Sequence, residues 1–589
     1  MKSSDEALKA TPRANLVYEF AGLRLDPRRR VLERGGRPVP LYARAFDALA
    51  LLVDGAGALV SKETMLQQLW PGVLVEENSV ARVMSDLRKA LREQAACVAT
   101  VPRRGYRLDA EVRAARRARQ PEVEGRRTLA VLPLASLSGE AADRLLGFGL
   151  ADGLITRLSQ LRSLLVRPTS AVARYVDAPA PAAVGRELNA EIVLCGGVRR
   201  SGGQVRVSLQ LVDVASEATI WAARFDEAEA AIFALKDSLS ARAADALALE
   251  LTRSEREQLA RRPTQDADAH DLYVRGRLCL SQRVGDSIQQ AAECFRRAVE
   301  RDPGFALAHA GLAEAYTLLS VASATLDPLP PRVMAPLAKA AAQQALELDE
   351  QLSEVHGILG HIGYCYDWDL AGAEAAIGRA LELNPSNAGA RQYHALGLSS
   401  VGRHDEALEQ MRLARLLDPT NMVMNANLGF ILYRARRYAA AVEQLRRTVA
   451  IDPDSAYARF RFGLAAEAAG LTDEALAQYE AVLAMPMADV HGLVGKGHLL
   501  ARLGREREVR EILDRLREIA ETRYVSAYYF AEIHAGLGET GAAFEWLERA
   551  YAERPVMMIS LRANPKFDGL REDPRFHDLE RRVGIWKNS

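Results

Sequence analysis

The spacing of apolar residues predicts short strands, three helices and a hairpin at the start of the chain. Residues 16–41 alternate polar and apolar positions between turn residues, which is typical of short strands. Apolar residues then fall on one helical face in 43–54, and Ser61 can cap a second helix, KETMLQQLW. A third helix is expected over Ser79–Leu91, and VATVPRRGYRLDAEV has the pattern of a hairpin. Together these elements predict an α+β domain over residues 1–112.

The expected third helix has one apolar face and one polar face. Apolar residues recur at helical spacing and are predicted to face the core: Val80, Val83, Met84, Leu87 and Leu91. The residues predicted to face outward are Ser79, Arg82, Ser85, Asp86 and Lys89, with Arg88 alongside them. The tip of the hairpin that follows is predicted at Arg103, Arg104 and Gly105. Helix and hairpin therefore both offer basic side chains to a partner.

A second domain is predicted after a polar linker. Residues 113–127 (RAARRARQPEVEGRR) are charge-rich and contain a proline, which predicts a flexible linker. Over 128–252, TLAVLPLASL indicates a buried strand, while GLADGLITRLSQL and PAAVGREL indicate helices. A half-buried strand is predicted where Val205, Val207, Leu209 and Leu211 alternate with Arg206, Ser208 and Gln210. Ser201-Gly202-Gly203 supplies the hairpin turn before it, so this part is predicted to be a small α/β domain.

The rest of the chain, 265–589, shows an internal repeat. Pro385, Pro419 and Pro453 are spaced by 34 residues, and each closes a similar apolar string. Glycines recur at the same period where two helices are expected to approach closely: Gly429, Gly463 and Gly497. This is the tetratricopeptide pattern of stacked helix pairs. We expect eight helix pairs, with an insertion around LDPLPPR, and then a C-terminal cap.

Charge separates the first domain from the remainder. The 589 residues carry no net charge, with 77 Lys+Arg against 77 Asp+Glu. Residues 1–119 hold 22 Lys+Arg against 14 Asp+Glu, which leaves 55 against 63 in the other residues. A basic domain on an acidic body indicates a polyanion as partner of the first domain alone.

The first domain resembles the OmpR/PhoB-type winged helix, especially its ToxR/CadC-like and HilA-like branch. The strings that carry the resemblance are PVPLYARAFDALALLV, VSKETMLQQLWPG, SVARVMSDLRKAL and VPRRGYRL. The resemblance implies that the third helix lies in the major groove of double-stranded DNA and that the hairpin, the wing, touches the minor groove. It also places the WPGVLVEEN loop, with Glu76 and Glu77, against RNA polymerase.

Roles for the candidate DNA-binding residues follow from the helix face and the resemblance. Arg82 is the best candidate for reading base edges, where the major groove carries a unique pattern of donors and acceptors. The expected phosphate or minor-groove contacts are Arg88, Lys89, Arg103 and Arg104. The set is completed by Ser79, Ser85, Asp86 and Tyr106. PhoB-like helices often carry basic residues at the positions of Ser85 and Asp86, so the family's sequence preference does not transfer.

The second domain resembles the TolB-amino-terminal-like domain that precedes tetratricopeptide repeats in cytoplasmic regulators, through strings such as VLCGGVRRSGGQVRVSLQLVDVASEATIWAARFD. This resemblance implies a fold and little about function. Gly147-Phe148-Gly149 stands before the predicted helix but does not match G-x-G-x-x-G, so these glycines are interpreted as structural. The groove of a tetratricopeptide superhelix usually binds a protein segment. The alternative is that the repeats supply only stability or dimer contacts.

Several classes of function are not supported by the sequence. The five cysteines lack metal-ligand spacing and are interpreted as buried free thiols, and no H-E-x-x-H or nucleophile-elbow motif is present. We therefore expect no enzyme activity, cofactor or metal. The start lacks an apolar run and no segment is long and apolar enough to span a bilayer, so a cytoplasmic location without a membrane partner is expected.

The sequence thus predicts a multidomain protein: an α+β winged helix, a small α/β domain and an all-α tetratricopeptide superhelix. Its predicted function is that of a DNA-binding transcriptional regulator, with RNA polymerase and a protein segment in the repeat groove as further partners. Two copies on paired DNA half-sites are a further expectation. The alternative is a non-catalytic scaffold whose winged helix binds protein rather than DNA.

Overall fold

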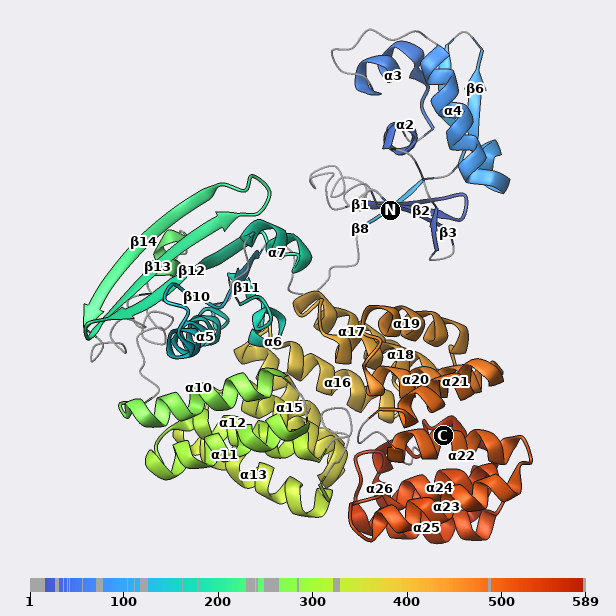
Figure 1. Ribbon diagram of the computed structural model, residues 1–589. Helices are drawn as coiled ribbons and strands as arrows, with labels where there is room; N and C mark the ends of the chain where they lie inside the picture. Colours follow the sequence, from blue (N-terminus) through green and yellow to red (C-terminus); the bar gives the residue numbers. More distant parts are fainter. Residues whose placement is uncertain are drawn as a thin grey trace. The chain divides into compact units, whose positions relative to one another are not determined.

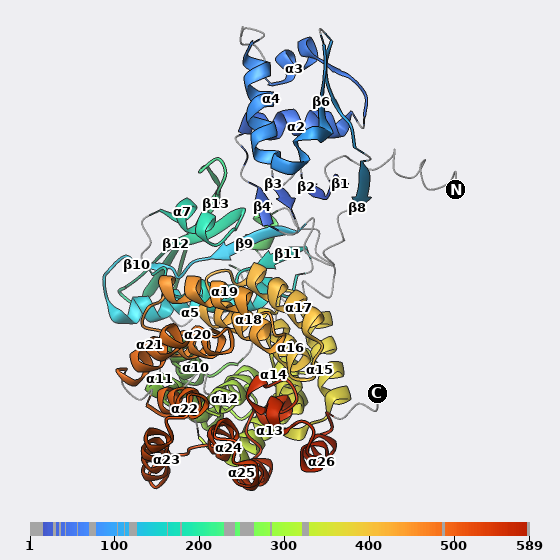
Figure 2. The same ribbon diagram turned by 90° about the vertical axis from the view of Figure 1, so that its right-hand side faces the viewer.

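The computed structural model consists of two compact units, residues 1–124 and 125–589, which are described separately. The structure describes residues 16–585 except 27–30, 35–36, 40, 42, 56, 70–77, 103, 111, 117–125, 162, 177–179, 229–238, 240–241, 248–263, 283–284, 321–328 and 486–488. Figures 1 and 2 show the chain in two views. No helix among these residues is long and apolar enough to cross a membrane.

The first unit begins with an antiparallel sheet of order β4-β3-β2-β1-β8. Its strands are β1 (Leu16–Phe20), β2 (Leu23–Asp26), β3 (Val31–Arg34), β4 (Arg37–Val39) and β8 (Arg113–Arg116). Strand β8 pairs with β1, Leu16 lying opposite Arg116. The first four residues of the predicted linker are therefore a strand of this sheet. The other linker residues up to 125 lie outside the described residues.

Three helices and a second, three-stranded sheet complete this unit. They are α2 (Ala43–Asp54), β5 (Val60–Ser61), α3 (Lys62–Leu69), α4 (Asn78–Leu91), the short helix η2 (Arg92–Cys97), β6 (Val98–Val101) and β7 (Gly105–Leu108). Helix α3 begins where predicted, because the Ser61 hydroxyl accepts a hydrogen bond of 3.0 Å from the backbone N–H of Thr64. The α+β class predicted for this part is confirmed.

The second unit begins with a mixed sheet of order β11-β9-β12-β13-β14, to which β10 adds beside β12. Its strands are β9 (Arg127–Val131), β10 (Ala135–Ser136), β11 (Leu164–Val166), β12 (Ile192–Ser201), β13 (Gln204–Asp213) and β14 (Thr219–Ala228). The predicted turn joins β12 to β13, and both Gly202 and Gly203 have positive φ, as a tight hairpin turn requires. The four alternating apolar residues predicted for β13 are all buried.

The described helices that pack with this sheet include α5 (Ala141–Leu158), α6 (Thr169–Val172) and α7 (Pro181–Glu187). Helix α5 starts earlier than predicted, so Gly147 and Gly149 lie inside it rather than before it. A Cβ at Gly147 would clash with the carbonyl oxygen of Leu134, and one at Gly149 would lie 3.0 Å from the methyl groups of Val274. The interpretation of these glycines as structural is confirmed, since they let α5 approach its neighbours closely.

The predicted eight helix pairs follow. They are α10 (Ala267–Gln282) and α11 (Gly285–Arg301), α12 (Ala306–Leu319) and α13 (Pro331–Leu348), α14 (Ser353–Ile362) and α15 (Leu370–Leu383), α16 (Ala388–Ser400) and α17 (His404–Leu417), α18 (Met422–Arg434) and α19 (Tyr438–Ile451), α20 (Ala456–Ala468) and α21 (Thr472–Leu483), α22 (Asp489–Arg502) and α23 (Glu506–Ala520), and α24 (Ala527–Gly536) and α25 (Thr540–Glu553). Helix α14 continues into a wider turn, η4 (Gly363–Asp367). Most of the predicted insertion around LDPLPPR lies outside the described residues.

The recurring glycines lie where helices touch, as predicted. A Cβ at Gly429 would clash with the Leu445 side chain, and one at Gly463 would clash with the ring of Tyr479. A Cβ at Gly497 would lie 3.1 Å from Ile512. A residue without a side chain therefore sets the close spacing of the helices within these pairs.

The α/β domain is docked onto the repeats at two places. The Arg167 guanidinium donates to the backbone oxygens of Leu416 and Leu417 at the end of α17, the second at 3.0 Å, and to that of Asn189 at 2.6 Å. At the first repeat, Arg277 of α10 lies 3.2 Å from the Asp152 carboxylate of α5. Figure 1 shows α5 between the sheet and the repeats. Domain and repeats therefore form one packed body.

The C-terminal segment returns to the middle of the array. It comprises η5 (Met558–Ser560), η6 (Pro565–Leu570) and α26 (Pro574–Val583). Just before it, Arg554 donates to the Tyr366 backbone oxygen at 2.7 Å and stacks on Trp368, with its guanidinium carbon 4.3 Å from the ring centroid. Further along, the Arg436 guanidinium pairs with the Asp568 carboxylate at 2.6 Å. The end of the array is therefore joined to its third and fifth helix pairs.

The five cysteines are free thiols, and the prediction that all are buried is wrong in part. Cys97 and Cys195 are buried, whereas the other three are half-buried: Cys279, Cys294 and Cys365. Burial raises the pKa of the Cys97 and Cys195 thiols, which keeps them protonated and unreactive at neutral pH.

Candidate nucleic-acid interface

Helix α4 presents a polar face because its apolar face is used by the core of the first unit. Val80, Met84, Leu87 and Leu91 are buried, in one cluster with residues of α2, α3 and the hairpin. The residues on the opposite face differ in exposure: Arg82, Ser85 and Lys89 are exposed, while Ser79, Asp86 and Arg88 are half-buried. The predicted division of the helix into two faces is therefore present.

Arg82 and Lys89 are the two exposed basic residues of this face. Arg82 makes no ion pair with any other residue that the structure describes. The Lys89 ammonium lies 3.7 Å from the Asp86 carboxylate, and its side chain is 77% exposed. Such an exposed pair contributes at most about 1 kcal/mol, so Lys89 can exchange Asp86 for another anion at little cost.

Arg88 is directed to the hairpin instead of outward. Its guanidinium donates two hydrogen bonds to the Val98 backbone oxygen, of 3.1 and 2.8 Å, and one of 2.6 Å to the Thr100 hydroxyl. The guanidinium carbon also lies 5.9 Å from the centroid of the Tyr106 ring. Arg88 thus holds strand β6 against α4 and sets the position of the hairpin relative to the helix.

The hairpin presents Arg104 and Arg107 at its surface. Arg104 lies exposed in the turn, where its backbone N–H donates to the Val101 oxygen at 3.0 Å. Arg107 was not among the predicted site residues, although it stands one position beyond Tyr106 in the same strand. Its guanidinium pairs with Asp109 at 2.5 Å, and this hydrogen bond lowers the pKa of the Asp109 carboxyl. The wing therefore carries basic groups on an exposed edge.

Tyr106 lies in the core rather than on the surface. The residue is 5% exposed and belongs to the apolar cluster of the first unit. Gly105, just before it, has a φ of +150°, and a Cβ there would clash with the Val60 backbone oxygen, so the strand lies close against β5. Tyr106 thus supports the base of the hairpin. Arg103, Glu76 and Glu77 lie outside the described residues.

Two family models match the chain. Residues 36–108 match the model described as "Transcriptional regulatory protein, C terminal", the OmpR/PhoB type. Residues 125–242 match the second domain of HilA/YgeH-like transcriptional regulators. The first match contains every described residue of the helix and hairpin surface, and the second covers the α/β domain.

Individual relatives match parts of the chain. The transcriptional regulator HilA of Salmonella typhimurium (strain LT2) is 25% identical over 409 residues, which are 68% of this chain and 71% of HilA. The putative adenylate cyclase 3 of Rhizobium meliloti (strain 1021) is 34% identical over 193 residues, and the match spans about a third of each protein, 33%. Among solved structures, the tetratricopeptide repeat protein YrrB is 22% identical, with a TM-score of 0.23 over 38% of this chain and 98% of YrrB.

Proposed function

We propose that this protein is a sequence-specific regulator of transcription. The chain carries an OmpR/PhoB-type DNA-binding domain, a HilA-like second domain and tetratricopeptide-like repeats. Helix α4 enters the major groove of double-stranded DNA and the β6–β7 hairpin contacts the adjacent minor groove. The observation that carries this proposal is the exposed polar face of α4, which Arg88 joins to a basic hairpin within the matched domain. A helix of this size fits the major groove, where base edges are distinguishable.

The exposed residues divide into reading and positioning roles. Arg82 reads base edges, because it is exposed on α4 and forms no ion pair within the described part of the chain. Lys89 and Arg104 bind phosphates, together with Arg103. Smaller side chains line the groove without adding positive charge: Ser79, Ser85 and Asp86. Arg88 acts mainly by fixing the hairpin, and Tyr106 acts by supporting its base.

The test compares a reading residue with a positioning residue on the full chain. Genome-wide mapping first supplies a bound site. Arg82→Ala should then cost about 1–3 kcal/mol on that site and broaden the range of sequences bound. Arg104→Ala is the matched variant and should weaken specific and random DNA by similar factors. Equal, sequence-independent losses for both variants contradict the reading role, and absence of any DNA binding at low salt contradicts the whole proposal.

The loop before α4 is a further proposed contact. Its residues Glu76 and Glu77 occupy the position that contacts RNA polymerase in the family that the sequence resembles. Replacing both with alanine should reduce transcription from the bound promoter while leaving its affinity for the protein unchanged. Full promoter output from a variant that binds normally argues against activation through this loop.

The second unit acts as a non-catalytic body that controls the DNA-binding domain. It does so by binding a protein segment and by bringing two copies together on paired half-sites, which raises their effective concentration. The protein works in the cytoplasm with the DNA it regulates. Because the adenylate cyclase relative matches over only a third of its length, we expect no cyclic nucleotide when the full chain is incubated with ATP and Mg²⁺. Measurable turnover contradicts the non-catalytic role.

A further inference from the structure

A large cavity lies inside the array, on the side where the first helices of successive pairs face one another. Residues of α14, α16, α18, α20, α22 and α24 line it. The C-terminal segment forms another wall through Met557, Ser560 and Asn564. The empty space is about 1420 Å³, including the part open to solvent at its mouth. The enclosed cavity volume within this space is about 150 Å³, the size of a cavity that admits a benzene-sized molecule.

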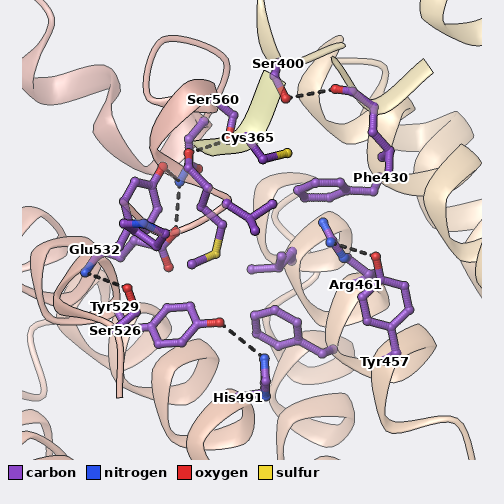
Figure 3. Close-up of a pocket in the computed structure, with 18 of the residues that line it drawn as sticks. Cys365, Ser400, Phe430, Tyr457, Arg461, His491, Ser526, Tyr529, Glu532 and Ser560 are labelled. Carbon is purple, nitrogen blue, oxygen red and sulfur yellow. Dashed lines mark hydrogen bonds between the residues drawn. The ribbon is translucent and has the colours of Figure 1, made fainter. Parts of the chain in front are cut away.

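Most of the cavity surface is apolar and much of it is aromatic. Three helices, α18, α20 and α24, contribute rings: Phe430, Tyr457, Phe460 and Tyr529, several of them labelled in Figure 3. Tyr529 is held in place by its hydroxyl, which lies 3.3 Å from Nε2 of His491. Flat rings around an enclosed space favour a ligand with an aromatic or otherwise apolar body.

Two arginines lie against one of these rings. The guanidinium carbon of Arg434 lies 4.2 Å from the centroid of the Phe430 ring, and that of Arg461 lies 3.2 Å from it. Within the described part of the chain, Arg434 donates only to the hydroxyls of Ser400, at 3.1 Å, and Ser560, at 2.8 Å. Neither guanidinium forms an ion pair with a carboxylate among the described residues. Two positive charges therefore share a mainly apolar space without an acidic partner.

The mainly apolar surroundings make it unfavourable for the folded protein to hold these two positive charges. Arg434 is 7% exposed, and burial, with repulsion from Arg461, lowers its pKa to about 10. Arg461 donates one hydrogen bond of 2.8 Å to the Tyr457 hydroxyl, while its Nε has no hydrogen-bond partner among the described residues. A buried charge without a counter-charge destabilises the folded state unless something else supplies the missing interaction. An anion in the cavity would supply it for both arginines.

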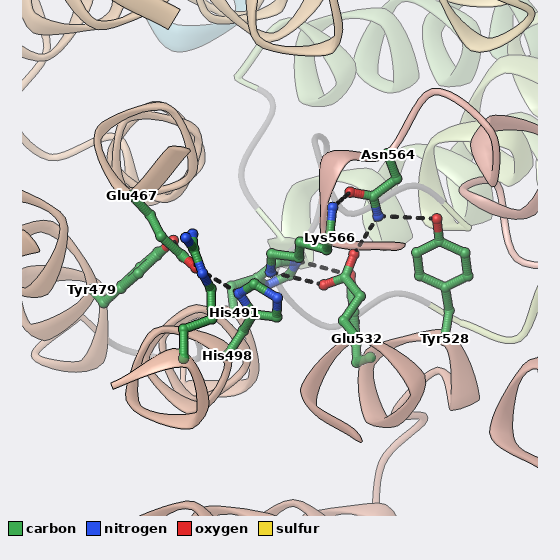
Figure 4. A network of polar contacts seen from close by, with 10 residues as sticks. Glu467, Tyr479, His491, His498, Tyr528, Glu532, Asn564 and Lys566 are labelled. Carbon is green, nitrogen blue, oxygen red and sulfur yellow. Dashed lines mark hydrogen bonds and ion pairs between the residues drawn. The ribbon is translucent and has the colours of Figure 1, made fainter. Parts of the chain in front are cut away.

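The acidic residue of the cavity does not fill that role. The Glu532 carboxylate lies 3.0 Å from the Lys566 ammonium and accepts a hydrogen bond of 2.8 Å from the Asn564 amide (Figure 4). Both side chains of this ion pair are buried, so they satisfy each other. The excess charge of the cavity lining is therefore positive, and it includes the two arginines beside Phe430.

We infer that this cavity binds a small organic anion, an acidic group on an aromatic or apolar body. The acidic group pairs with the guanidinium groups of Arg434 and Arg461 at the cavity wall, and the body packs among Phe430, Phe460 and Tyr529. Ser560 belongs to the C-terminal segment and its hydroxyl accepts a hydrogen bond from Arg434 of α18. An occupied site therefore also strengthens the contact between the C-terminal segment and α18. Binding of such an anion lets the second unit respond to a chemical signal, and this binding does not require DNA.

The test uses a fluorescent anion on the full chain. Anilinonaphthalene sulfonate has an acidic group on fused rings, whereas N-phenylnaphthylamine has the same rings without the charge. We expect the sulfonate to bind one site per chain at least about tenfold more tightly than the uncharged amine, since a charge-assisted contact separates them. Phenylacetate should displace the sulfonate, and phenylacetamide should not.

Variants locate the site. Arg461→Gln should weaken the sulfonate by about tenfold and leave the amine nearly unchanged. The matched control is Arg507→Gln on α23, whose side chain is 92% exposed, and it should change neither probe. If circular dichroism shows that Arg461→Gln disturbs the fold, Phe430→Leu replaces it and should weaken both probes. Equal affinity of the two probes for the wild type, or unchanged sulfonate binding in the folded variant, overturns the inference. Displacement by peptides but not by phenylacetate also overturns it, in favour of a protein segment.

Discussion

His361 should make the stability of the array depend on pH in a defined range. It lies at the end of α14 and is 6% exposed, with its ring stacked on Tyr393 at a centroid distance of 4.4 Å. Its Nδ1 lies 3.6 Å from the Cys365 sulfur, and no charged group contributes to its titration. Burial alone lowers the pKa of His361 from 6.5 to about 4. The folded protein therefore holds this imidazole in its neutral form.

The sign and size of the effect follow from this lowered pKa. Between pH 6.5 and about 4 the unfolded chain binds a proton at His361 and the folded chain does not, so acid favours unfolding. One pH unit in this range corresponds to about 1.4 kcal/mol. Lowering the pH from neutral to about 5 covers roughly 1.5 units below the unfolded pKa and should remove about 2 kcal/mol of stability. Below the folded pKa no further loss is expected from this residue.

Urea unfolding of the full chain, followed by the helical circular dichroism signal at pH 7.5 and 5.0, measures the effect. His361→Gln replaces the imidazole with a neutral amide, so the variant should lose about 2 kcal/mol less than the wild type on acidification. His356→Gln removes a histidine from the same helix outside the cavity lining and is the matched control. If the wild type and His361→Gln lose the same free energy between the two pH values, the imidazole is not kept neutral by burial, and the reasoning is wrong.

Three further predictions concern the scaffold. Ser61→Ala removes the hydroxyl that accepts from Thr64, so the melting temperature of the first unit should fall with a loss of about 1 kcal/mol. Gly147→Ala places a methyl group against the Leu134 carbonyl and should cost about 1–3 kcal/mol in urea unfolding, whereas Gly153→Ala in the same helix, where nothing lies within 4 Å, should cost little. Arg167→Met should speed hydrogen exchange at the end of α17, because the backbone oxygens of Leu416 and Leu417 lose their donor. Unchanged exchange there means that the docking of the α/β domain on α17 does not depend on this contact.

Local periodicity predicted much of the fold because the elements that it found are defined by their own residues. The 34-residue spacing of Pro385, Pro419 and Pro453 repeats one helix pair, and the alternation around Val205 matches a strand buried on one face. Two errors came from contacts between distant parts of the chain. Strand β8 is a polar segment that pairs with β1, about a hundred residues earlier. Gly147 was placed before the predicted helix, but close packing against Leu134 requires a glycine inside α5.

The candidate sites likewise contain features that the local sequence predicts and features that depend on contacts between distant parts of the chain. The two faces of α4 follow from its sequence, so Arg82 and Lys89 lie on the exposed side as expected. The sequence did not show that Arg88 would donate a hydrogen bond to the Val98 backbone oxygen, because that contact depends on the fold of the hairpin. The cavity was missed because its lining comes from many helices between α13 and α24 and from the C-terminal segment. One available signal was Arg461, a charged residue among the small and aromatic residues of AYARFRFGLA.

The return of the C-terminal segment changes how the array can come apart. In an open solenoid each repeat touches only its neighbours, so unfolding can begin at the free end and proceed one unit at a time. Here the contacts of Arg554 with Tyr366 and of Arg436 with Asp568 close the last six pairs into a ring. A ring has no terminal unit that can be lost alone, since releasing the last pair also exposes the third. This part of the array should therefore behave as one cooperative block, and a break anywhere in it opens the space at its centre.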